Sequence, residues 1–120
     1  MADSIVAQKA FKFAIRIVKL YSFLKSQKQE YVLAKQLLRS GTSIGANAEE
    51  AVAAQSRADF VNKLSIALKE TRETSYWLRL LRETEFLDEV AFKNIHSDCL
   101  ELQKMLSSII LSSKKATHNS

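Results

Sequence analysis

The chain has 120 residues, with 18 Lys and Arg against 13 Asp and Glu, and a net charge of +5. This length fits one domain, and a composition of only two glycines and no proline excludes a strand-rich fold with several hairpins. The single cysteine excludes an internal disulfide and a cysteine-rich zinc site. No apolar run approaches the roughly 20 residues of a membrane span, and the N-terminus lacks the apolar core of a signal peptide. We therefore expect an all-α cytoplasmic protein without a membrane contact.

Four segments carry apolar residues at steps of three and four, which place side chains on one face of a helix. The predicted helices cover approximately residues 3–25, 30–54, 57–82 and 89–113. Short links join them, which favours an antiparallel up-down-up-down four-helix bundle. We expect this bundle to span residues 1–113 and the remaining residues, 114–120, to form a disordered or frayed tail.

Two predicted helix starts carry polar residues that suit N-caps. Ser56 is followed three positions later by Asp59, much like a capping box, and Asp88 precedes the last helix. The residues expected in the core, in chain order, are Val6, Ala10, Phe13, Ile17, Tyr21, Leu24; Leu33, Leu37, Gly41, Ile44, Ala48, Ala51, Val52; Phe60, Leu64, Leu68, Thr71, Ser75, Leu78; Phe92, Ile95, Cys99, Leu102, Leu106 and Ile109.

Basic residues form a stripe along the first predicted helix, and the excess of positive charge lies in the first third of the chain. The stripe spans an arc of about 80°, and no acidic residue lies three or four positions from any of its members. Such a stripe can bind nucleic-acid phosphates, and the alternative is an ordinary solvated helix face. The candidate nucleic-acid-binding residues are Lys9, Lys12, Arg16 and Lys19, supported by Lys35 and Arg39 one turn apart on the second helix.

Both glycines of the chain lie in the middle of the second predicted helix. Gly41 and Gly45 fall on its apolar side, although a mid-helix glycine costs about 1 kcal/mol relative to alanine. We therefore expect a helix-packing motif at which a neighbouring helix approaches closely. A phosphate-binding loop is disfavoured because the glycines follow no strand. A polar flank beside them contains Ser40, Ser43, Asn47 and Glu50, whose expected role is to hydrogen-bond to an adjoining helix.

Catalytic and metal sites are not predicted. A di-iron bundle needs Glu-x-x-His pairs, and neither His96 nor His118 has a glutamate three positions before it. His96 is expected to be a hydrogen-bonded core or interface residue. For Glu50, a catalytic role is the weaker alternative to its structural role in the polar flank. No nucleophile, base and orienting group can be argued as a unit. We therefore expect no cofactor, no metal and no enzymatic activity.

The third predicted helix is apolar on two faces. One face carries the core residues, and the second lies a third of a turn or more away. A second apolar seam favours a subunit interface, because monomers seldom expose such a patch, whereas the alternative is one wide core seam. The candidate oligomer-interface residues are Ile66, Trp77, Leu80 and Leu81.

The sequence closely resembles the four-helix-bundle proteins encoded in intervening sequences of bacterial 23S ribosomal RNA genes, a family also described as ribosomal proteins. The resemblance runs from about Phe11 to Leu111, and implies a ring-shaped homopentamer. The family is in turn similar to the accessory variability determinant of diversity-generating retroelements, a basic pentameric barrel that binds nucleic acid and a reverse transcriptase. The segments that carry the resemblance are 37–47 (LLRSGTSIGAN), Glu50-Ala51, Asp59-Phe60, 63–70 (KLSIALKE) and Tyr76-Trp77-Leu78.

Together these patterns predict a non-enzymatic homo-oligomer that binds RNA or DNA through the phosphate backbone. The alternative is a protein scaffold or adaptor that recruits a nucleic-acid enzyme such as a reverse transcriptase or nuclease. In an oligomer the basic stripe is repeated in every subunit, and multivalency makes weak phosphate contacts effective.

Overall fold

Four helices joined by short links form the part of the chain that the structure describes. The computed structural model describes the backbone of residues 2–119 and the side chains of residues 5–116. The helices are α1 (Ala2–Lys28), α2 (Val32–Val52), α3 (Arg57–Glu83) and α4 (Glu89–Asn119), and no strand occurs among these residues. The all-α prediction is therefore confirmed, and α4 extends as helix beyond residue 113, where the sequence predicted a frayed tail.

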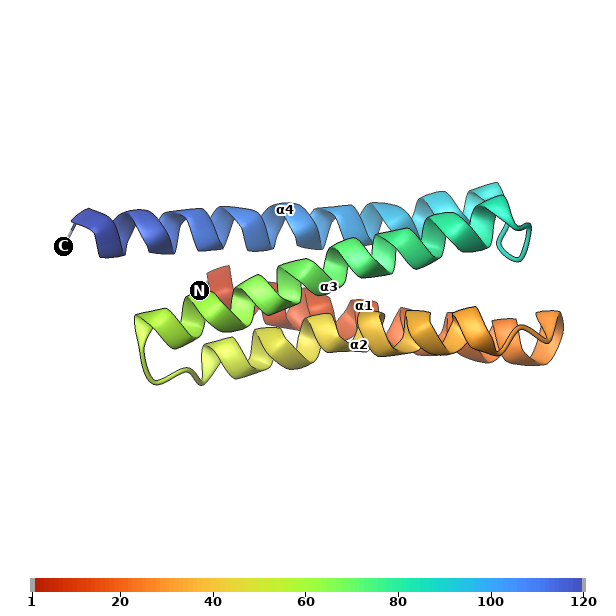
Figure 1. Ribbon diagram of the computed structural model, residues 1–120, viewed down its shortest axis with the longest axis horizontal. Helices are drawn as coiled ribbons and strands as arrows, with labels where there is room; N and C mark the ends of the chain where they lie inside the picture. Colours follow the sequence, from red (N-terminus) through yellow and green to blue (C-terminus); the bar gives the residue numbers. More distant parts are fainter. Residues whose placement is uncertain (1, 120) are drawn as a thin grey trace.

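The helices run antiparallel in an elongated bundle of 52 × 21 × 20 Å (Figure 1). The α1–α2 and α3–α4 links lie at one end, and the α2–α3 link lies at the other end, near both termini of the described chain. Each helix packs against the helices next to it in the order α1, α2, α3, α4, and α4 closes the circle through a smaller contact with α1. The bundle therefore has the predicted up-down-up-down topology.

Local sequence sets the helix ends. The Ser56 hydroxyl accepts a hydrogen bond from the Asp59 backbone N–H at 3.0 Å, and the Asp88 carboxylate accepts one from the Ala91 N–H at 2.8 Å. Both predicted N-caps are thus present. Just after the C-terminal ends of α1 and α3, Gln29 and Glu85 lie in the left-handed backbone region, with φ of 54° and 66°.

The core is a single apolar cluster drawn from all four helices. Most of the predicted core positions are buried, including Phe13, Ile17 and Leu106. Two predictions at helix ends are wrong. Val52, at the end of α2, is 49% exposed. At the C-terminal end of the apolar seam of α4, Ile110 is buried, whereas the predicted Ile109 is only partly buried against the cluster.

Candidate nucleic-acid interface

The basic stripe on α1 is partly neutralised by α4. Lys9 Nζ lies 2.9 Å from Glu101 Oε1, and Arg16 forms an ion pair with Asp98 and a hydrogen bond to the side-chain oxygen of Asn94. The expectation of an unpaired stripe is therefore wrong at Lys9 and Arg16. The sequence argument compared neighbours on the same helix, whereas the acidic partners lie on α4, 92 and 82 residues later in the chain.

The other two members of the stripe keep free charges. Lys12 and Lys19 are exposed, and within the described residues neither makes an ion pair. They alternate along α1 with the two paired residues. The cations available to a ligand on this helix face are therefore about half of those predicted.

Of the two supporting residues on α2, Arg39 is ion-paired and Lys35 is not, within the described residues. Arg39 extends to α3, where its guanidinium lies 3.3 Å from a carboxylate oxygen of Glu70 and also pairs with Glu73. Glu70 is buried, so Arg39 offsets the cost of placing a carboxylate in the bundle. Lys35 is exposed and makes no ion pair within the part of the chain that is described. Arg39 is thus a structural residue in this bundle, and Lys35 remains available.

The glycines lie where α2 meets α1. A Cβ atom at Gly41 would lie 2.8 Å from the Cγ1 and Cγ2 atoms of the buried Ile17, and one at Gly45 would lie 3.3 Å from the Ala10 carbonyl oxygen. Both distances are shorter than ordinary van der Waals contact. The absence of side chains here is therefore what allows the two helices to approach so closely.

The polar flank of α2 bonds mostly within its own helix. The Asn47 side-chain amide donates to the Ser43 carbonyl at 2.9 Å, and Glu50 is exposed. The predicted bond to an adjoining helix is made by Ser40, whose hydroxyl accepts a hydrogen bond at 3.0 Å from Thr74 on α3. The expected contact of the flank with an adjoining helix is thus present at Ser40, which is fully buried.

The apolar seam predicted on α3 faces the bundle more than the solvent. Leu81 is completely buried in the core, and Leu80 and Trp77 are half-buried. Of the four predicted interface residues, only Ile66 is exposed, at 37%. Leu81 is therefore a core residue and not an interface residue, because the apolar face of α3 is wide enough to pack against both α2 and α4.

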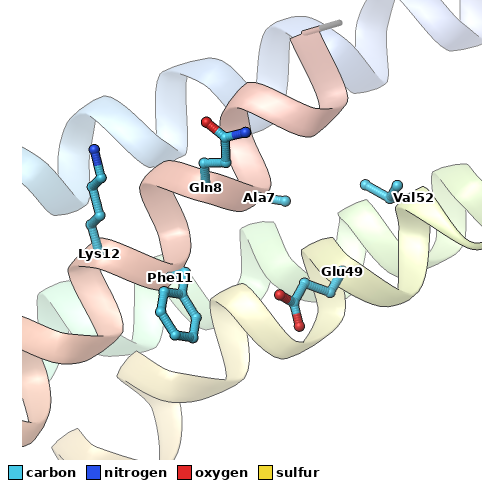
Figure 2. A pocket seen from close by; sticks show the side chains of 6 residues that line it. All are labelled: Ala7, Gln8, Phe11, Lys12, Glu49 and Val52. Atoms are coloured by element: carbon cyan, nitrogen blue, oxygen red, sulfur yellow. The ribbon is translucent and has the colours of Figure 1, made fainter.

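A more exposed apolar surface lies on α1, where it borders α2. Phe11 is 57% exposed, and Ile15 and Val18 follow it on the same outer side of the helix. A groove of about 540 Å³ opens beside Phe11, between α1 and α2. Figure 2 shows Ala7 and Phe11 facing Glu49 and Val52, while Lys12 points away from α2. The sequence signal was present as aromatic and β-branched residues outside the core seam of the first helix.

The α3–α4 contact contains two titratable groups. His96 Nε2 lies 2.8 Å from the Ser75 hydroxyl, and the ring stacks on Phe92 with centroids 4.6 Å apart. Burial, with Arg79 and Arg82 nearby, lowers the pKa of His96. Burial raises the pKa of Cys99 to about 12, and its thiol donates to the Thr71 carbonyl. Both groups are therefore neutral at pH 7.

No metal or membrane site emerges from the described residues. Nowhere in that part of the chain do three His, Cys, Asp or Glu side chains gather closely enough to hold a metal ion. None of its helices is long and apolar enough to cross a membrane.

Comparison with known proteins places the chain in a family. No curated protein matches it. A crystal structure of a protein of unknown function from the S23 ribosomal protein family of Bacteroides thetaiotaomicron is 55% identical, with a TM-score of 0.90, and the match covers 92% of this chain and 98% of that one. The profile of the 23S rRNA-intervening sequence proteins matches residues 2–108. This chain belongs to the 23S rRNA-intervening sequence protein family.

Proposed function

We propose that the protein is a non-enzymatic, self-associating protein that binds RNA or DNA through the phosphate backbone. The observation that carries this proposal is that three of the six predicted binding residues, Lys12, Lys19 and Lys35, are exposed and make no ion pair among the described residues of a chain of net charge +5. Such cations release condensed counterions when they contact phosphates, which supplies sequence-independent affinity. The ion-paired Lys9, Arg16 and Arg39 hold helices together and contribute less.

Self-association is part of the proposal because three lysines give only weak binding. The exposed apolar residues Phe11, Ile15 and Val18 form a surface on which a second subunit can pack. Repeating the lysines in each subunit converts weak contacts into avid binding. The family resemblance suggests a homopentamer, which the mass of the protein in solution tests directly, and the sequence favours a cytoplasmic location.

Binding is tested by fluorescence anisotropy with a labelled ribosomal-RNA fragment and an unrelated RNA of equal length, at several salt concentrations. We expect log affinity to fall with log salt by about 0.7 to 0.9 per neutralised phosphate. The double substitution Lys12→Glu with Lys19→Glu should weaken binding and flatten that slope. The matched control is Lys104→Glu with Lys114→Glu, the same charge change at two exposed lysines of α4 that make no ion pair among the described residues. Equal losses in both variants would show that net charge and not the α1 stripe is responsible.

Self-association is tested by light scattering on the same samples. Phe11→Glu places a charge in the apolar surface of α1 and should lower the mass of the particle. Val90→Glu is the control, because Val90 is 80% exposed and lies on α4. An unchanged mass in Phe11→Glu would move the subunit contact to another surface.

A second candidate function is a scaffold that recruits a nucleic-acid enzyme. It is favoured by the ion pairs of Lys9, Arg16 and Arg39, which remove half of the predicted cations from the ligand-binding surface. Protein partners that survive nuclease treatment of a pull-down would support it. Absence of RNA binding by the folded oligomer at low salt would make it the leading candidate.

A further inference from the structure

A second row of cations lies on the outer face of α3. Lys69, Arg72, Tyr76 and Arg79 follow one another at steps of three and four, which places them on one side of the helix, and all four are exposed. None of the three cations makes an ion pair within the described residues. We call these four residues the α3 stripe.

Acidic residues near the α3 stripe form ion pairs with cations outside it. Glu70 and Glu73, which lie within the same stretch of α3, face Arg39 of α2. On the neighbouring α4, Asp98 and Glu101 pair with cations of α1. These four acidic residues therefore already have cationic partners outside the stripe.

An aromatic ring stands in the middle of the stripe. Tyr76 is 50% exposed, and its ring packs edge-to-face against Trp77, with centroids 5.1 Å apart at 78°. The Trp77 indole N–H is 3.4 Å from Glu73 Oε1, which fixes the supporting ring to α3. The Arg79 guanidinium lies 5.9 Å from the Tyr76 centroid. A braced ring between cations is the arrangement that stacks bases while phosphates are neutralised.

We propose that the α3 stripe binds a single-stranded segment of nucleic acid, with Arg72 and Arg79 contacting phosphates and Tyr76 stacking on an unpaired base. This inference rests on the proposed function and narrows its ligand. A duplex offers phosphates to the same cations, but its bases are stacked inside and present no free face to a tyrosine. Preference for single strands therefore distinguishes the α3 stripe from the lysines of α1 and α2, which read charge alone.

The test compares a labelled pyrimidine-rich RNA single strand with the duplex of the same strand, each titrated with the full chain. Tyr76→Leu removes the ring but keeps an apolar side chain, and should weaken single-strand binding about tenfold, as expected for one base stack, with duplex binding unchanged. Tyr76→Phe should restore it. Tyr31→Leu is the matched control, because Tyr31 is an exposed tyrosine outside the stripe.

The only tryptophan of the chain, Trp77, provides a second measurement. Its fluorescence should change when the single strand binds and remain constant with the duplex, because it contacts the Tyr76 ring. Equal losses of single-strand and duplex affinity in Tyr76→Leu, or an unchanged single-strand affinity, would overturn the assignment of Tyr76 while leaving the proposed function intact. Binding of neither RNA at low salt would overturn both.

Discussion

The bundle holds α1 and α4 by different means. α1 lies against α2 so closely that two glycines face its side chains and backbone, and the contact is apolar. α4 contacts α1 through Lys9–Glu101 and Arg16–Asp98, and contacts α3 partly through His96–Ser75 and Cys99–Thr71. Close packing resists any added volume, whereas exposed ion pairs contribute little to the free energy of unfolding. The comparison teaches that α1 and α2 are held by close apolar packing and that the polar contacts of α4 chiefly set its register.

The largest effect is expected where the helices approach most closely. Gly41→Val introduces three carbon atoms against the buried Ile17, and overpacking should lower the free energy of unfolding by about 2–3 kcal/mol. Urea unfolding measures this. Ala46→Val, on the exposed side of the same helix, is the control and should cost only about 0.5 kcal/mol. Equal costs at the two positions would contradict the close approach of α1.

The α2–α3 contact sharpens the comparison because it contains a buried charge. Arg39→Met leaves the Glu70 carboxylate without its cation and should lower the free energy of unfolding by about 1–3 kcal/mol. Lys35→Met removes a cation one turn away that has no acidic partner among the described residues, so we expect little change in stability. A larger loss of stability in Lys35→Met than in Arg39→Met would reverse the assigned roles.

The ion pairs between α1 and α4 should contribute much less. A double-mutant cycle with Lys9→Met and Glu101→Gln measures the coupling free energy of one half-exposed pair, and we expect about 0–1 kcal/mol. A coupling energy above about 2 kcal/mol would make this contact as important as the glycine contact. The same cycle at high salt should give a smaller value.

The smallest effect is expected at His96, between α3 and α4. Its pKa is lowered in the folded state, so the unfolded state binds more protons as the pH falls through the ordinary histidine pKa near 6.5. The free energy of unfolding should therefore decrease between pH 7.5 and pH 5.5. His96→Gln should reduce this dependence, and His118→Gln is the control. If His118→Gln reduced the pH dependence of stability and His96→Gln did not, His96 would not be the titrating group.

Helical periodicity was sufficient to predict the fold. The three- and four-residue steps through Phe13, Ile17 and Leu106 placed the core, and the polar residues Ser56 and Asp88 marked helix starts correctly. Each of these signals is local, because neighbours on one helix face decide it. The exposure of Val52 could not be read in this way, since it depends on where the adjacent helix ends.

The site was predicted less completely because ion pairs between helices are not local. Lys9 and Arg16 have no acidic neighbours on α1, and only the packing of α4 brings Glu101 and Asp98 to them. Helical phasing likewise separated Leu81 from the core seam, although packing on two sides buries it. The family, by contrast, was recognisable from contiguous motifs, and that recognition is confirmed.

The deeply placed thiol of Cys99 has a practical consequence. Because its pKa is about 12 and the side chain is fully buried, the native cysteine does not compete for thiol-reactive reagents near neutral pH. A cysteine introduced at an exposed position, such as Ala46 on α2, therefore becomes the one labelled site in an otherwise natural chain. Spin labels or fluorophores attached there can test the proposed self-association without removing Cys99 from the core.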